Sequence, residues 1–277
     1  MGRQGDEAMD IKQYKKDFSY SYTLGAFPTF ELIDSRPHDV LEVFCSSSFT
    51  EMEKLGQKCT ENGIGLTVND KVINKLSDKG NVYVVGLFRK YEQDIDNDKP
   101  HLVLVNPSDM GNLGTIIRTA VGFGIMDLAI IEPAADVFNP KTVRASMGSV
   151  FRLRHKRFSS FEEYMKYAGL RYSDTHVAET GNFSKQAIIS VNSDPAKKDL
   201  AKREIFTFML NGENQLTVAD CPKPELYSLV FGNEAAGLPD EFLAYGTSIL
   251  IPQTEYVDSL NLTIAAGIGM YMFTCRT

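Results

Sequence analysis

Three apolar segments of this chain each run into a compact group of polar residues and glycines. They read HLVLVNPSDMGNLG from His101, VFGNEAAGL from Val230 and ILIPQTEYVDSLN from Ile249. An apolar run that stops at polar groups is typical of a buried strand. In parallel sheets, ligands bind beyond the carboxyl ends of such strands. The three strand ends therefore predict one assembled site.

Strand-like and helix-like segments alternate along the chain on both sides of a charged stretch, YEQDIDNDK, at residues 91–99. This alternation predicts an α/β fold with a mostly parallel sheet that helices cover on both faces. The polar stretch, which Pro100 follows, has the composition of a linker. We predict an N-terminal extension over 1–19, a small α/β domain over 20–90, the linker over 91–99 and a larger domain over 100–277.

Within the larger domain the pattern predicts several elements. We expect a helix over 113–123, a strand over 151–158, a short strand THVAE at 175–179, and a last helix that begins at Ser259. The stretch over 181–224 has no sharp period, and it predicts no element.

The composition excludes several classes of protein. Hydrophobic residues make up 43% and charged residues 23% of the 277 residues, which is typical of a globular chain. No apolar stretch reaches the roughly 20 residues that span a bilayer, and the first ten residues lack a signal-peptide core. We therefore expect a cytoplasmic protein without a membrane segment. The four cysteines and four histidines are scattered, so we expect neither a disulfide framework nor a metal site.

A basic cluster, FRLRHKRF at residues 151–158, stands out in a chain whose net charge is -7. The total charge argues against a general nucleic-acid binder, although local charge matters more than the sum. Two functions stay open for the cluster: phosphate binding, or a strand edge that lysine and arginine protect from aggregation. The residues concerned, with two upstream, are Lys141, Arg144, Arg152, Arg154, Lys156 and Arg157.

The polar groups also have ordinary structural explanations. Asn112 is well placed to cap a helix that carries Arg118 on its surface, and Glu234 suits the first turn of a helix near 238–245. Ser259 and Asn261 suit the start of the last helix. Two other chemistries are excluded: GNLG lacks the GxGxxG spacing of a dinucleotide site, and RASMG lacks the GxSxG elbow of a serine hydrolase.

In this order and spacing, the three groups resemble the signature motifs of the SpoU/TrmH branch of the SPOUT RNA methyltransferases. The motif N-x-G-x-x-x-R-T-A stands at 112–120, F-G-N-E-A-x-G-L at 231–238, I-P at 251–252 and S-L-N at 259–261. The match covers 100–277. The small N-terminal domain looks like the L30e-like substrate-binding domain of this family, by pattern alone.

The resemblance implies a trefoil-knotted SPOUT architecture and a homodimer. It implies transfer of a methyl group from S-adenosylmethionine to a ribose 2′-hydroxyl of rRNA or tRNA. The residues implied to hold the cofactor are Gly232, Ile251 and Leu260. Those implied to act in catalysis are Arg118, Asn112, Glu234, Ser259 and Asn261, with Glu234 expected to hold the Arg118 guanidinium. The basic cluster is the implied RNA contact.

The chain departs from the family pattern at two places. It reads Gly80-Asn81-Val82-Tyr83 where relatives often carry a His-Gln-Gly segment, a difference that bears on which RNA is the substrate and not on the methyl-transfer site. Gln253 stands where many relatives carry Met, a difference that bears on the cofactor pocket. Two other classes of function stay open. One is an RNA-binding protein on the same fold without catalysis, against which the intact motifs argue. The other is a small-molecule enzyme on an open α/β sheet, which a nicotinamide or nucleoside triphosphate ligand would indicate.

Overall fold

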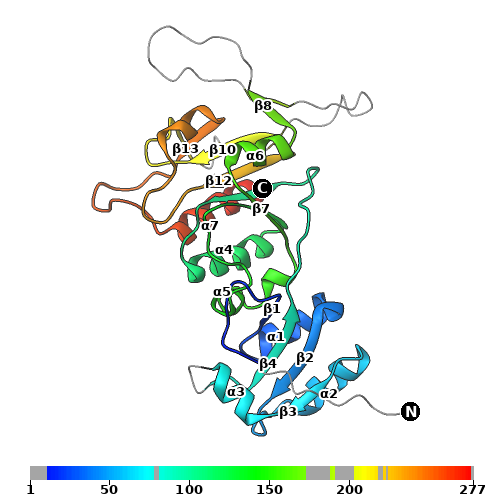
Figure 1. Ribbon diagram of the computed structural model, residues 1–277. Coiled ribbons are helices and arrows are strands. Elements are labelled where there is room, and N and C mark those ends of the chain that lie inside the picture. The colour runs from blue at the N-terminus through cyan, green and yellow to red at the C-terminus, as the bar shows by residue number, and fades with distance from the viewer. Residues whose placement is uncertain are drawn as a thin grey trace.

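The described residues of the computed structural model form two large sheets, one toward each end of an elongated molecule, and a small two-stranded one (Figure 1). The structure describes residues 11–77, 81–172, 188–190, 203–217, 221–222 and 224–275. The expected THVAE strand at 175–179 lies outside these residues. No helix in the described ranges is both long and apolar enough to cross a bilayer.

The first sheet has four strands in the order β1-β4-β2-β3. β4 pairs antiparallel with β1 and β2, whereas β2 and β3 are parallel. Its strands are β1 (Tyr20–Tyr22), β2 (Val40–Cys45), β3 (Leu66–Val68) and β4 (Val84–Arg89). Its helices are α1 (Ala26–Ser35), η1 (Pro37–Asp39), α2 (Met52–Glu61) and α3 (Asp70–Leu76).

The second sheet has seven strands in the order β11-β13-β10-β12-β5-β6-β7, and every neighbouring pair is parallel. The expectation of an α/β fold with a mostly parallel sheet is confirmed. The strands are β5 (His101–Val105), β6 (Asp127–Ile131), β7 (Arg154–Phe158), β10 (Glu204–Phe208), β11 (Asn214–Gln215), β12 (Tyr227–Phe231) and β13 (Thr247–Leu250). A separate pair joins β8 (Leu170–Tyr172) to β9 (Ile188–Ser190).

Alternate residues of the central strands face two different hydrophobic layers. In β5, Leu102 and Leu104 pack with Met270 of α7 in one buried cluster, whereas Val103 packs with Tyr164 of α6 in the other. Because strand side chains alternate between faces, a run such as HLVLV is apolar throughout only when both faces are covered. The covering elements are α4 (Met110–Gly122), α5 (Pro140–Ala145), η2 (Ser149–Phe151), α6 (Phe161–Tyr167), η4 (Asp240–Ala244) and α7 (Leu262–Thr274).

Several predicted boundaries are wrong, for local reasons. α4 begins at Met110 because the Asp109 side chain accepts from the Asn112 N–H at 2.7 Å; Asp109, and not Asn112, is the cap. α7 begins after Asn261, which is itself the cap, and not at Ser259. The expected strand over 151–158 is shorter because η2 occupies its start. β10, which the sequence analysis does not predict, lies in the interior of the sheet.

The two sheets share a hydrophobic core. Leu32 and Phe88 of the first sheet's layer lie in the same buried cluster as Phe138 and Phe151 of the second. The Phe88 and Phe151 rings meet edge to face with centroids 5.0 Å apart. Such a core fixes one sheet relative to the other, unlike a polar interface.

A buried arginine ties the strand β10 and the linker to the starts of the parallel strands. Arg203 is 5% exposed, and it donates to the carbonyls of Tyr227 at 2.8 Å, Asn97 at 3.0 Å and Lys99 at 2.7 Å. His101 lies beside it, and burial together with the Arg203 charge lowers the pKa of His101 to about 3. The histidine is therefore neutral, and Arg203 supplies hydrogen bonds to three carbonyls at this edge of the sheet.

Replacing this arginine tests how far the linker depends on it. We expect Arg203→Ala to lower the free energy of unfolding by about 3–5 kcal/mol, because buried carbonyls lose their partners. Urea unfolding followed by circular dichroism measures the change. The matched control Lys166→Ala removes an exposed cation of α6 and should stay within about 0.5 kcal/mol of the parent protein. Equal stability of the two variants would contradict the role given to Arg203.

Candidate functional site

A pocket lies at the carboxyl ends of β10, β12 and β13. Two of the three strand ends that the sequence singles out, those of β12 and β13, form it, whereas no residue of the segment after β5 lines it. Its cavity volume is ≈ 220 Å³. The segments that follow β10, β12 and β13 supply its walls, and the start of α7 closes it. The predicted site residues in the lining are Gly232, Glu234, Ile251, Ser259 and Leu260, and Gln253 joins them.

The turn after β12 depends on a glycine. A Cβ atom at Gly232 would stand 2.1 Å from the carbonyl carbon of Gly237, a distance that no side chain tolerates. Two backbone hydrogen bonds between Asn233 and Gly237, at 3.1 and 2.9 Å, close this turn, and Gly237 adopts a φ of 67°. Because Gly232 has no side chain, its backbone itself forms part of the pocket wall.

The Glu234 carboxylate joins the β12 turn to the segment that follows β5. It accepts hydrogen bonds from the Ser108 N–H at 3.0 Å, the Ser108 hydroxyl at 2.8 Å and the Asp109 N–H at 3.1 Å. The expected contact between Glu234 and Arg118 is wrong, since these two described residues form no ion pair with one another. Partial burial opposes its charge, but the hydrogen bonds outweigh that effect, so the pKa of Glu234 is lowered.

Asn233 is a site residue that the sequence analysis does not single out. Its side-chain amide donates to the Asn106 carbonyl at 2.8 Å, and its oxygen accepts from the Ala235 N–H at 2.9 Å. Asn106 itself adopts a φ of 52°, an uncommon backbone for a residue other than glycine. An asparagine between Gly232 and Glu234, in a turn, is the signal that would have identified it.

Three predicted catalytic residues, Asn112, Arg118 and Asn261, lie outside the pocket lining. Asn112 is half-buried in the first turn of α4, beside the Asp109 cap. Arg118 is exposed two turns further along, and it forms no ion pair with any described residue. Asn261 stands at the start of α7, where its side chain accepts from the Thr263 N–H at 2.8 Å.

The predicted RNA-binding residues of the basic cluster are mostly neutralised by acids from other parts of the chain. Arg154 forms a bidentate pair with Asp127 at 2.6 Å, Lys156 meets Asp94 at 2.5 Å, and Arg157 meets Glu132 at 2.5 Å. Arg152 pairs with Glu31 at 2.5 Å. The strand β7 is an edge strand, as the aggregation-protection alternative requires. Lys141 is exposed and Arg144 is half-buried on α5.

No group of three or more His, Cys, Asp or Glu side chains that could hold a metal occurs in the part of the chain that the structure describes. The four cysteines form no disulfide.

The family model described as the SpoU rRNA Methylase family matches residues 99–271. The chain belongs to this family. It is 31% identical to the 23S rRNA (uridine(2479)-2'-O)-methyltransferase of Streptomyces viridochromogenes, over 60% of this chain and 48% of that protein. It is 25% identical to the 23S rRNA (guanosine(2553)-2'-O)-methyltransferase RlmP of Bacillus subtilis, over 65% of this chain and 60% of that protein. The chain thus spans about half the length of these two curated relatives.

The SpoU fold also matches solved structures over nearly the whole chain. An AdoMet-bound rRNA methyltransferase from Sinorhizobium meliloti has a TM-score of 0.67 at 25% identity, over 92% of this chain and 86% of that one. The SpoU methyltransferase AviRb from Streptomyces viridochromogenes has a TM-score of 0.70 at 21% identity, over 92% and 88%. The second likeness supports the fold alone. The family model matches from residue 99, at the end of the predicted linker. The four-stranded first sheet lies before that residue, so only the solved structures include a counterpart of it.

The Gly232 turn provides a direct test of this SpoU pocket. We expect Gly232→Ala to abolish binding of S-adenosylmethionine and to cost about 1–3 kcal/mol of stability, because the new methyl group displaces the Gly237 backbone. Isothermal calorimetry and thermal unfolding measure the two effects. Gly122→Ala is the matched control, since its Cβ would meet nothing within 4 Å. Undiminished binding by the Gly232 variant would show that this turn does not form the pocket wall.

Glu234 predicts a dependence of stability on pH. The pKa of Glu234 is lower in the folded protein than its ordinary value of 4.5. The ionised carboxylate therefore stabilises the fold at any pH above 4.5, and this stabilisation is lost as the pH falls through the folded pKa. We expect Glu234→Gln to cost about 1–2 kcal/mol at neutral pH and almost nothing in strong acid. Urea unfolding of both proteins from neutral pH to strong acid measures this difference in the free energy of unfolding. A difference that does not change with pH would refute the expectation.

Proposed function

We propose that this chain transfers a methyl group from S-adenosylmethionine to a ribose 2′-hydroxyl of rRNA or tRNA. The observation that carries the proposal is the pocket at the ends of β10, β12 and β13, where Gly232, Ile251 and Leu260 come together. Family membership and the relatives' names give the reaction its chemical class. The AdoMet-bound structure from Sinorhizobium meliloti, at 25% identity, supports the choice of cofactor.

The pocket has the character that an adenosyl group requires. Apolar side chains such as Ile251, Leu238 and Leu260 form part of its lining, and they suit the faces of a purine. The Gly232 turn adds main-chain groups that hydrogen-bond to a base or sugar. Among the described residues, neither a lysine nor an arginine lines it, which suits a ligand whose sulfur is already positive. Bound there, S-adenosylmethionine supplies an electrophilic methyl group.

The remaining task of the protein is to place and activate a ribose hydroxyl. Placement carries much of the rate in an in-line displacement. Glu234 does not act as the base, because its oxygens accept from Ser108 and Asp109 and its pKa is lowered. Its part is to hold the β12 turn against the segment after β5, so that the pocket and the start of α4 keep one geometry.

Arg118 supports the transfer through its charge. An arginine has a pKa above about 12, so it is a poor proton acceptor but a strong partner for a developing alkoxide or a neighbouring phosphate. Its guanidinium is exposed and forms no ion pair within the described residues, so it is available to an anionic ligand. Because Arg118 lies outside the pocket lining, the RNA that carries the reacting hydroxyl must reach both this guanidinium and the bound cofactor. Asn112, Ser259 and Asn261 would organise the same region.

The finer architecture follows the same proposal. We infer the trefoil knot from the family to which the chain belongs. The helix α7, whose start lines the pocket, packs against both α4 and β12. The homodimer is supported by two large apolar side chains on α7, Ile264 at 55% and Tyr271 at 54% exposure. We also propose the division into an L30e-like domain over 20–90, a linker over 91–99 and a SPOUT domain over 100–277. It is supported by the four-stranded sheet, whose strands all precede residue 91, and by the parallel sheet, whose strands all follow residue 100.

Two measurements together test the proposed reaction. Calorimetry with S-adenosylmethionine asks whether the pocket binds it, and methyl transfer from labelled cofactor to total RNA asks whether the chain is a catalyst. Binding without transfer to any RNA would favour a non-catalytic RNA-binding protein. Mapping of ribose methylation in cells with and without this chain then identifies the nucleotide.

Removing Arg118 separates binding from chemistry. We expect Arg118→Ala to reduce methyl transfer by about a hundredfold or more while the dissociation constant for S-adenosylmethionine stays within about twofold, because the guanidinium acts on the acceptor and not on the donor. Arg118→Lys keeps the charge and should recover part of the activity. Full activity of the alanine variant would remove Arg118 from the mechanism.

A further inference from the structure

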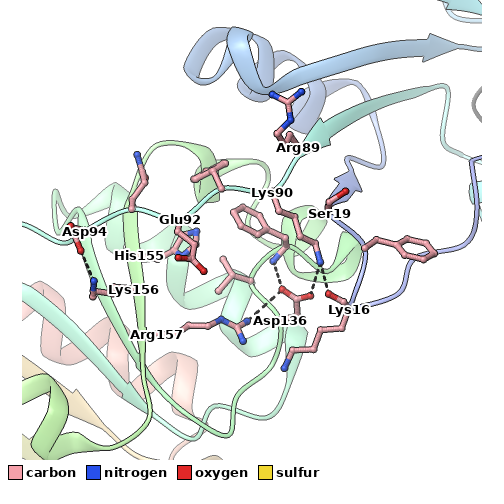
Figure 2. Close-up of a pocket in the computed structure, with 15 residues that line it drawn as sticks. Lys16, Ser19, Arg89, Lys90, Glu92, Asp94, Asp136, His155, Lys156 and Arg157 are labelled. Atoms are coloured by element: carbon pink, nitrogen blue, oxygen red, sulfur yellow. Dashed lines mark hydrogen bonds and ion pairs between the residues drawn. The ribbon is translucent and has the colours of Figure 1, made fainter.

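A second and larger cavity, of ≈ 880 Å³, lies where the two sheets meet. Its walls come from the segment before β1, the end of β4, the linker, the loop after β6 and the strand β7. Figure 2 shows Arg89 and Lys90 on one side and His155 with Arg157 on the other, around Asp136. The size is within the range of ligand pockets, and none of the residues given a role in methyl transfer lines it.

The lining is basic in a chain that is acidic as a whole. Five basic and three acidic side chains line the cavity, a formal charge of +2, against -7 for the chain. The basic residues are Lys16, Arg89, Lys90, Lys156 and Arg157. Lys16 and Arg89 form no ion pair with any described residue. Two cations are therefore free for an anionic ligand.

Aromatic rings line the same cavity. Phe18 lines the cavity and stacks on Tyr20, with centroids 5.1 Å apart and planes at 22°. Tyr91 and Phe138 line the deeper wall and meet edge to face at 4.8 Å. A half-exposed ring next to lysine and arginine is the arrangement that proteins use to stack a base and hold its phosphate.

Two polar atoms in the cavity wall have no hydrogen-bond partner among the described residues. They are Nε2 of His155 and Oε1 of Gln93. His155 is 6% exposed and packs against the rings of Tyr91 and Phe138. Burial, with the charges of Arg157 and Arg36, lowers the pKa of His155 to about 4, so the ring is neutral. Buried polar atoms are normally paired, and a base edge offers both donors and acceptors.

Asp136 holds the walls of the cavity together. Its carboxylate lies 3.5 Å from the Lys90 ammonium and 3.5 Å from the Arg157 guanidinium, and it accepts from the Tyr14 hydroxyl. These partners come from the segment after β4, from β7 and from the segment before β1. The cavity is thus preformed, and a ligand need not order it.

We propose that this cavity binds one unpaired nucleotide of the RNA substrate, outside the methyl-transfer pocket. This rests on the proposed function. The base stacks on Phe18. Lys16 and Arg89, whose side chains point away from one another in Figure 2, contact different phosphates of the RNA backbone. An unpaired nucleotide fits because its face and edge are free, whereas paired bases in an A-form helix expose little of either.

The experiment compares RNA binding by the parent protein with that of Lys16→Ala/Arg89→Ala and of Phe18→Leu. The probe is a short single-stranded oligouridine with a terminal fluorescein, and anisotropy reports the dissociation constant over a range of salt. We expect the double variant to bind about three- to tenfold more weakly at about 0.1 M salt, with a salt slope lower by about 0.7 for each phosphate that it no longer neutralises. Phe18→Leu should weaken binding with an unchanged slope, because stacking involves no counterion.

A matched control and a site-specific readout make the outcome specific. Lys71→Ala removes one exposed cation of α3 outside the cavity and should bind as the parent does. Photocrosslinking with 4-thiouridine in the probe should label peptides that contain Phe18 or Tyr91. An equal loss in the Lys71 variant, or unchanged binding by the double variant, overturns the proposal.

The failure of this proposal can be told apart from failure of the proposed function. S-adenosylmethionine binding by calorimetry should be equal in the parent and all cavity variants. If the parent binds cofactor and methylates RNA while the cavity variants bind RNA normally, only the cavity proposal fails. If the parent binds neither cofactor nor RNA, the methyltransferase proposal fails first.

Discussion

The parallel pairing of β12 with β5 is the constraint on which the site depends. Register places Phe231 beside Leu104, so the two strands end at the same edge and their following segments must meet there. Glu234 and Asn233 then bond to the backbone around Asn106 and Ser108. With β10 on the other side of β12, the same edge gathers the rest of the pocket lining. The site is thus a product of strand order more than of any single motif.

Some charged side chains in and near the site are held by other parts of the protein, whereas others are free to contact a ligand. Glu234 is engaged by backbone donors, and Arg154 is engaged by Asp127. Arg118 stays exposed on α4. A family motif alone does not make this distinction, because it gives Glu234 and Arg118 equal weight. The geometry assigns the first to the framework and leaves the second to meet the substrate.

The sequence predicts what is local and misses what is distant. The gathering of Gly232, Ile251 and Leu260 could be predicted because each lies just beyond an apolar strand, and the α/β fold follows from the same runs. The partner of Glu234 lies 126 positions away, and that of Arg152 lies 121 positions away, so neither pairing is visible in the pattern. β10 escapes prediction because its apolar core, at residues 205–208, lies inside a long stretch without periodicity. The predicted cap positions are wrong by two or three residues because several Asn, Asp and Ser side chains compete for each helix start.

Asp136 draws together three parts of the chain that enter from different directions, and the shared core around Phe88 and Phe151 supports that junction. The distance between the first sheet and the methyl-transfer pocket is therefore set by the protein and not by its ligand. The two ends of the molecule are therefore held at a fixed separation. On the function proposed above, an RNA that contacts both the first sheet and the pocket would be selected by the spacing and curvature of its own fold, so two RNAs with identical target nucleotides but different surroundings would be treated differently.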